Sequence, residues 1–216
     1  MPASCCLKEL SVATNERNKA MPSLAANALH YLRYRVGLDP ARTQTTEAER
    51  ALLGELAPGR KVIVELGVFE GVSSRVLRVA MDRDAELYCI DPFPTGRLGF
   101  SPQQNISEKE IAKSQNGSVH LRRCFSYQAL KNWNSSIDLL YMDADHSFEG
   151  VSRDFREWTQ FVASGGLILI HTSHSSPNKP VPESCGPLRL VNEVIAIDPG
   201  FKIRDCVDSM TVVEKL

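Results

Sequence analysis

The chain has 216 residues, of which 43% are hydrophobic and 24% are charged, and its formal net charge at pH 7 is -1. This composition is typical of a globular domain. The near-neutral charge, without a long Lys or Arg run, argues against nucleic acid or an anionic membrane as a partner. A small-molecule partner is therefore expected, and the composition leaves a homodimer open.

The sequence gives no sign of export or membrane insertion. No apolar run approaches the roughly 20 residues that a spanning helix needs, and the first residues lack the apolar core of a signal peptide. The six cysteines are scattered without a CxxC pair, which argues against a disulfide framework and a structural zinc site. We therefore expect a cytoplasmic protein.

The N-terminal part reads as a polar, aperiodic leader followed by two helices. Apolar residues in 21–36 have helical spacing, and Thr46 with Glu49 forms a capping box before a second apolar helical face. We expect residues 1–57, the leader and these helices, to pack on a core domain formed by residues 58–216.

From residue 61 onward, short apolar runs alternate with longer helical segments. The runs expected to form parallel strands are 61–66, 86–91, 118–123, 137–143 and 166–171. Two further runs, 201–208 and 210–215, are almost contiguous and predict an antiparallel hairpin. The sequence therefore predicts an α/β fold: a doubly wound, Rossmann-like, seven-stranded sheet, mostly parallel, with a C-terminal antiparallel hairpin and helices on both faces.

The turn VELGVFEGVSS at 64–74 joins the first strand to its helix. Gly67 and Gly71 permit close approach of a ligand to the backbone, and Ser73 and Ser74 lie at the helix start, where free N–H groups face a ligand. The spacing G-x-x-x-G differs from the G-x-G-x-x-G of dinucleotide sites, so an NAD-dependent oxidoreductase is the less favoured alternative. Asp91 ends the second strand, where acids in nucleotide-binding folds accept hydrogen bonds from a ribose.

These motifs resemble class I S-adenosylmethionine-dependent methyltransferases. The glycine turn resembles the first motif of that family. The segment at 137–158, followed by SGGLILIH at 164–171, resembles small-molecule O-methyltransferases with a D-x-D-H-S-F-x-G segment. The resemblance implies an enzyme that transfers a methyl group from S-adenosyl-L-methionine to a hydroxyl of a small molecule, such as a sugar or secondary metabolite. A non-catalytic protein that binds the same cofactor is the alternative.

The resemblance also implies which residues bind the cofactor. They are Glu65, Gly67, Gly71, Ser73, Ser74, Asp91, Ser126 and Asp143. Asp91 would hold the ribose, and Ser126 would border the adenine. Ser126 has a structural alternative, as the N-cap of a helix at 127–133.

Asp143, Asp145 and His146 directly follow the fourth strand. Carboxylates at the end of a buried strand are costly unless they are solvated, paired or bound to a ligand. We predict these three residues as catalytic: His146 takes the proton of the acceptor hydroxyl, and one of the two acids orients its ring. The structural alternative is that His146 or Asp145 caps the helix at 147–155.

A magnesium site is disfavoured at this position. In metal-dependent relatives, the acid matching Asp143 acts with an acidic pair after the fifth strand, but here Thr172 and Ser173 occupy that place, and hydroxyls are poor ligands for Mg²⁺. No metal is favoured. If the protein holds one, the candidate ligands are Asp143, Asp145, His146, His171 and His174, a set that suits zinc or iron better.

Two irregular segments, 92–105 and 174–187, follow the second and fifth strands. We expect them to form the acceptor pocket and its lid, with Arg97 as a partner for an anionic acceptor. On the helix after the fourth strand, Phe155 and Trp158 are predicted core residues, whereas Arg153 and Asp154 are predicted surface charges.

Overall fold

The computed structural model describes residues 24–95 and 99–216, which form two units divided between Pro40 and Ala41. The described part of the first unit contains α1 (Leu24–Arg35), and in it Arg33 Nε donates a 2.9 Å hydrogen bond to Asp39 Oδ2. The predicted leader lies outside the described residues. We predicted a domain boundary between residues 57 and 58. In the structure the helix α2 (Glu47–Leu56), which precedes that point, belongs to the second unit.

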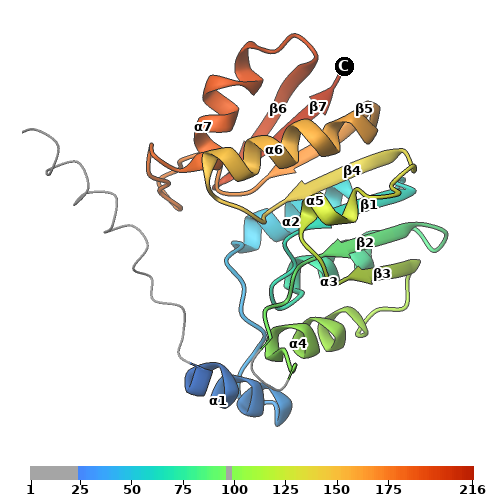
Figure 1. The fold of residues 1–216 in the computed structure, drawn as a ribbon, viewed down its shortest axis with the longest axis vertical. Coiled ribbons are helices and arrows are strands. Elements are labelled where there is room, and N and C mark those ends of the chain that lie inside the picture. Colours follow the sequence, from blue (N-terminus) through green and yellow to red (C-terminus); the bar gives the residue numbers. More distant parts are fainter. Residues whose placement is uncertain (1–23, 96–98) are drawn as a thin grey trace, which may run out of the picture. The chain divides into compact units, whose positions relative to one another are not determined.

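The second unit alternates strands and helices, as the sequence predicts (Figure 1). Its elements are α2 (Glu47–Leu56), β1 (Val62–Leu66), α3 (Val72–Ala80), β2 (Glu86–Ile90), α4 (Pro102–Ile111), β3 (Ser118–Arg122), α5 (Ser126–Ala129), β4 (Ile137–Met142), α6 (Phe148–Trp158), β5 (Val162–Ile170), α7 (Gly186–Glu193), β6 (Phe201–Val207) and β7 (Met210–Lys215). A short 3-10 helix, Thr159–Phe161, precedes β5, and another, Ile195–Ile197, follows α7.

The seven strands of the described residues form one sheet in the order β3-β2-β1-β4-β5-β7-β6. Strands β1 to β5 pair in parallel, whereas β7 runs antiparallel to both β5 and β6. The predicted fold class and C-terminal hairpin are therefore confirmed. The strand order reverses between β1 and β4, which is where ligands bind in open α/β sheets.

Helices cover both faces of this sheet, because its strands are apolar on both sides. One hydrophobic cluster joins α5, α6 and α7 to the sheet and contains the predicted core residues Phe155 and Trp158. The other joins α2, α3 and α4 to the opposite face through residues such as Leu53 and Leu77. The predicted capping box is present: Thr46 Oγ1 accepts from Glu49 N at 3.1 Å, and Thr46 N donates to Glu49 at 2.8 Å.

The register of the central strands sets the position of the site. Leu66 at the end of β1 pairs with Ile90 of β2 and Met142 of β4, and Met142 pairs with Ile170 of β5. The residues that follow these strands therefore leave the sheet at one edge and at one level. They are Gly67, Asp91, Asp143 and His171.

Two local predictions differ from the structure. The helix expected at 127–133 is the short α5, and Phe125 is its N-cap, so Ser126 is not a cap. Strand β5 begins at Val162, earlier than the predicted start at residue 166. Its pairing with β4 shifts register between Ile137 and Leu139. Among the described residues, no helix is both long and apolar enough to cross a bilayer.

Candidate active site

A cavity of about 610 Å³ opens at the edge of the sheet where the strand order reverses. Its wall is built from residues 42–45, the glycine turn, the segment after β2, the start of α5 and the segment after β4. Of the predicted cofactor residues, those that line it are Gly67, Ser73, Asp91, Ser126 and Asp143. Glu65, Gly71 and Ser74 lie outside its wall.

The two glycines of the turn are required by close packing. Gly67 has φ +88° and a Cβ at this position would lie 2.1 Å from the carbonyl oxygen of Asp143. Gly71 has φ +77° and its Cβ would lie 2.7 Å from Cα of Ser107. Gly67 therefore lets β1 and β4 end against each other at the cavity, whereas Gly71 lets α3 pack on α4.

Glu65 anchors α3 to β1. Its carboxyl group is fully buried and accepts hydrogen bonds from the hydroxyls of Ser73 and Ser74. Burial raises the pKa of Glu65 to about 7, although the two hydroxyls oppose this shift. Glu65 thus holds the start of α3 without lining the cavity, whereas Ser73 both binds Glu65 and lines the cavity.

Asp91 braces the loops on both sides of the cavity mouth. Its Oδ2 accepts from Val68 N at 2.9 Å and Phe69 N at 3.1 Å, and its Oδ1 accepts from Phe93 N at 2.7 Å. Phe69 and Phe93 have left-handed backbones, with φ of 53° and 44°. A carboxylate has about four lone-pair sites, so Asp91 retains capacity for a ligand hydroxyl.

The prediction that Asp154 is a surface charge is wrong. Its side chain is 2% exposed, lines the cavity and accepts a 2.6 Å hydrogen bond from Ser126 Oγ. Burial raises the pKa of Asp154, against the opposing hydrogen bond from Ser126 and the charge of Arg153. Arg153 also lines the cavity, and its guanidinium lies 4.8 Å from the ring centroid of Tyr127.

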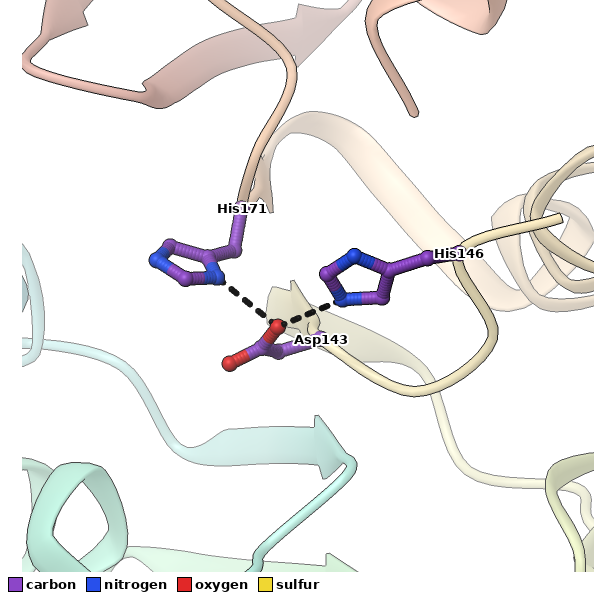
Figure 2. A group of neighbouring side chains, drawn as sticks. All are labelled: Asp143, His146 and His171. Carbon is purple, nitrogen blue, oxygen red and sulfur yellow. Dashed lines mark hydrogen bonds and ion pairs between the residues drawn. The ribbon is translucent and has the colours of Figure 1, made fainter. Parts of the chain in front are cut away.

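Asp143, His146 and His171 form a compact polar cluster at the end of β4 (Figure 2). Oδ1 of Asp143 lies 2.8 Å from His171 Nδ1 and 3.2 Å from His146 Nε2. Burial would raise the pKa of Asp143, but the two imidazoles lower it overall. Hydrogen bonding to Asp143, together with Cys185, raises the pKa of His146 to about 10.

A buried ion pair supports His171 from its far side. Its Nε2 lies 3.4 Å from Glu49 Oε2 and 2.7 Å from Lys179 Nζ, and Lys179 Nζ lies 3.0 Å from Glu49 Oε2. Glu49 is fully buried, and Ser209 donates to it through N and Oγ, at 2.9 and 2.7 Å. The sequence predicts the capping role of Glu49, but neither this pairing nor the role of Lys179.

Asp145 and His174, both predicted candidates, stand apart from this cluster. Asp145 is exposed and its Oδ1 accepts from Ser147 N at 2.9 Å. Ser147 is the N-cap of α6, so neither His146 nor Asp145 has that role. Nδ1 of His174 lies 2.9 Å from the carbonyl oxygen of Asp208.

The two long loops contribute unequally to the cavity. Pro92, Pro94 and Gln103, from the predicted loop at 92–105, line it, whereas no described residue of 174–187 does. Arg97 lies outside the described residues. The second loop instead supplies Lys179 behind His171.

Comparisons with known proteins agree with this architecture. Residues 64–173 match the family model described as a methyltransferase domain. The chain is also 29% identical over 113 residues to an uncharacterized protein of Acanthamoeba polyphaga mimivirus, a match that spans 49% of this chain and 48% of the relative. The matched region thus spans about half the length of this curated relative.

Solved methyltransferase structures share the fold at low sequence identity. An O-methyltransferase from Bacillus cereus in complex with SAH has a TM-score of 0.63 and 15% identity, covering 94% of this chain and 97% of that one. The O-methyltransferase TomG from Streptomyces achromogenes, involved in tomaymycin synthesis and solved with SAM, has a TM-score of 0.60 and 16% identity, covering 96% of each chain. Because the family model matches more than half of its residues, this chain belongs to the methyltransferase domain family.

Proposed function

We propose that the chain transfers the methyl group of S-adenosyl-L-methionine to a hydroxyl oxygen of a small molecule. One observation carries this proposal: a single cavity joins the glycine turn and Asp91 on one side to Asp143 and His146 on the other. The cavity could therefore hold the cofactor beside the glycine turn and Asp91, and the methyl acceptor beside Asp143 and His146. Family membership and the O-methyltransferases that share the fold support the cofactor and the oxygen acceptor.

The cofactor would lie along the glycine turn. Gly67 exposes backbone to the cavity, and Asp91 would accept hydrogen bonds from the ribose hydroxyls. Phe125, which is 51% exposed and lines the cavity next to Ser126, offers a ring on which a base can stack. Asp154, held by Ser126, offers a carboxyl oxygen to an amino group of that base.

The methyl group would then face the cluster after β4. The acceptor oxygen attacks the methyl carbon in line as the carbon–sulfur bond breaks, so positioning supplies most of the catalysis. The hydroxyl proton must also leave. The carboxylate of Asp143 and the imidazole of His146, both on the cavity wall, are the groups placed to receive it. Asp145, the third predicted catalytic residue, also lines the cavity, but it is exposed and lies outside the cluster of Asp143, His146 and His171.

Binding and turnover assays test this function in sequence. Calorimetry should show S-adenosylhomocysteine binding in preference to NAD⁺. Asp91→Ala should weaken that binding by about 5- to 150-fold, because it removes acceptors for the ribose and the brace of the turn. Asp84→Ala is the matched control, because Asp84 is a 72% exposed side chain paired with Lys61.

Turnover separates an enzyme from a binding protein. With S-adenosylmethionine carrying a labelled methyl group and pooled hydroxylated acceptors, label should pass into an acceptor. Preference for NAD⁺ would overturn the proposal. Tight cofactor binding without transfer to any acceptor in a broad pool would support the non-catalytic alternative.

A further inference from the structure

Two imidazoles converge on one carboxylate oxygen in this site. His146 Nε2 and His171 Nδ1 approach Oδ1 of Asp143 from different elements, one before α6 and one after β5 (Figure 2). A catalytic histidine needs one carboxylate to orient it. Three donor atoms within 4.8 Å of one another could also serve as ligands of one ion.

Two of the three spacings between these atoms are close to those between metal ligands. Ligand atoms about 2.1 Å from a metal, at tetrahedral or octahedral angles, lie about 3.0 to 3.4 Å apart. The distances from Asp143 Oδ1 to the two nitrogens are 2.8 and 3.2 Å. Each imidazole nitrogen therefore lies at about a ligand's distance from Asp143 Oδ1.

There is also space of the right size next to these atoms. A small cavity of about 10 Å³ is lined by Asp143, His146 and His171, by the further acids Asp145 and Asp154, and by apolar residues. This volume is about that of one water-sized sphere. The small cavity shares Asp143 and His146 with the wall of the large one, so a bound ion would lie beside the acceptor.

His171 has a carboxylate near its second nitrogen, as many metal-binding imidazoles do. Such a histidine usually has a carboxylate or carbonyl at its second nitrogen, which fixes the ring. Here Glu49 Oε2 lies 3.4 Å from His171 Nε2, and Lys179 Nζ lies 2.7 Å from the same nitrogen. Lys179 balances the buried charge of Glu49.

We propose that Asp143, His146 and His171 bind one divalent transition ion of the zinc or ferrous iron class. Two imidazoles and one carboxylate suit these ions, whereas Mg²⁺ prefers oxygen ligands. After β5 the chain supplies only hydroxyl oxygens: Thr172 Oγ1 lies 3.1 Å from His171 Nδ1, and the buried Ser173 hydroxyl donates to Ile170 O at 2.6 Å. The proposal departs from the expectation of no metal, and it excludes His174.

An ion here would act as a Lewis acid that favours loss of the acceptor proton. That role rests on the proposed function, but binding of the ion does not. The binding test therefore uses the metal alone, without cofactor or acceptor. Its failure would leave methyl transfer standing, and absence of methyl transfer would leave a positive binding result standing.

The experiment titrates chelator-stripped, untagged full chain with Zn²⁺, Co²⁺ and Mg²⁺ in a calorimeter. We expect one Zn²⁺ or Co²⁺ per chain, bound more tightly than Mg²⁺, and visible absorption bands from bound Co²⁺. His146→Ala and His171→Gln should each weaken binding by about tenfold or more and abolish those bands. His146 is the cleaner test, because its side chain is 40% exposed and its loss spares the core.

His174→Ala and His120→Ala are the matched controls, since both histidines lie outside the cluster and should leave binding unchanged. Circular dichroism confirms the fold of each variant. No saturable Zn²⁺ or Co²⁺ binding would overturn the proposal. So would equal losses in cluster and control variants, or a preference for Mg²⁺.

Discussion

Gly67 and the carbonyl oxygen of Asp143 face each other so closely that a Cβ on Gly67 would lie 2.1 Å from that oxygen. The glycine belongs to the turn after β1, and the aspartate follows β4. The turn on the cofactor side and the cluster on the acceptor side therefore share a backbone contact. A side chain at Gly67 would therefore displace the backbone at Asp143.

Replacing Gly67 with Ala should lower the free energy of unfolding by about 2 to 4 kcal/mol, because the methyl group overlaps Asp143 and the positive φ strains an L residue. Gly59→Ala is the control: Gly59 has φ +77°, but no atom lies within 4 Å of its Cβ position. That variant should lose only about 1 kcal/mol. Urea denaturation measures both, and equal losses would exclude the contact as the cause.

Glu65 should make stability depend on pH. Its pKa is about 7 in the fold against 4.5 for the free group, so the folded chain holds more protons between these values. The free energy of unfolding should therefore fall as pH rises through this window, by about 3 kcal/mol from this group. Below pH 4.5 Glu65 is protonated in both the folded and the unfolded state, so its contribution to stability no longer changes with pH.

The Glu65→Gln variant lacks this titration. Its stability relative to the unmodified chain should increase between about pH 5 and pH 7.5, as measured by urea denaturation at each pH. Other titrating groups cancel in the comparison. Parallel pH profiles for the two proteins would contradict a raised pKa at Glu65.

Ser126 and Asp154 should be energetically coupled. Ser126→Ala removes a hydrogen bond to a buried carboxyl and should lower the free energy of unfolding by about 1 to 3 kcal/mol. In an Asp154→Ala background the same change should cost about 1 kcal/mol less, because the partner is gone. A double-mutant cycle in urea measures this difference, and additive losses would show that the two residues act independently.

Lys179→Met should strongly destabilise the protein. It leaves the fully buried Glu49 without its cation, which typically costs about 3 to 5 kcal/mol. Amide exchange around Gln44 should also rise, because Lys179 Nζ donates to its carbonyl oxygen at 2.7 Å. Lys61→Met, which breaks exposed pairs, should cost less than about 1 kcal/mol. Similar losses in the two variants would show that the Glu49 pair is not stabilising.

The fold could be predicted because its signals are local. Apolar runs mark each strand, and the interval between 201–208 and 210–215 marks the hairpin. The site was partly predictable for the same reason, since parallel strands bring residues such as Gly67, Asp91 and Asp143 to one edge. Their contacts then follow from the strand register.

The residues that the sequence missed are paired through tertiary structure. Glu49 meets Ser209 across 160 positions, and no local pattern reports such a contact. Asp154 did carry a signal, because it lies three residues after Val151 and four before Trp158, on the buried stripe of α6. An acidic residue such as Asp154 on the buried face of a helix needs a polar partner, and here that partner is Ser126.

The sheet order also has a consequence for how the protein is made. Strand β7 is the last in sequence, yet it lies between β5 and β6, and the turn before it supplies Ser209 to Glu49. While the ribosome is still adding residues 201–209, β6 has no neighbour and Glu49 has no backbone donor from Ser209. The parallel half of the sheet can form during translation, but the support behind His171 is completed only after β7 leaves the exit tunnel.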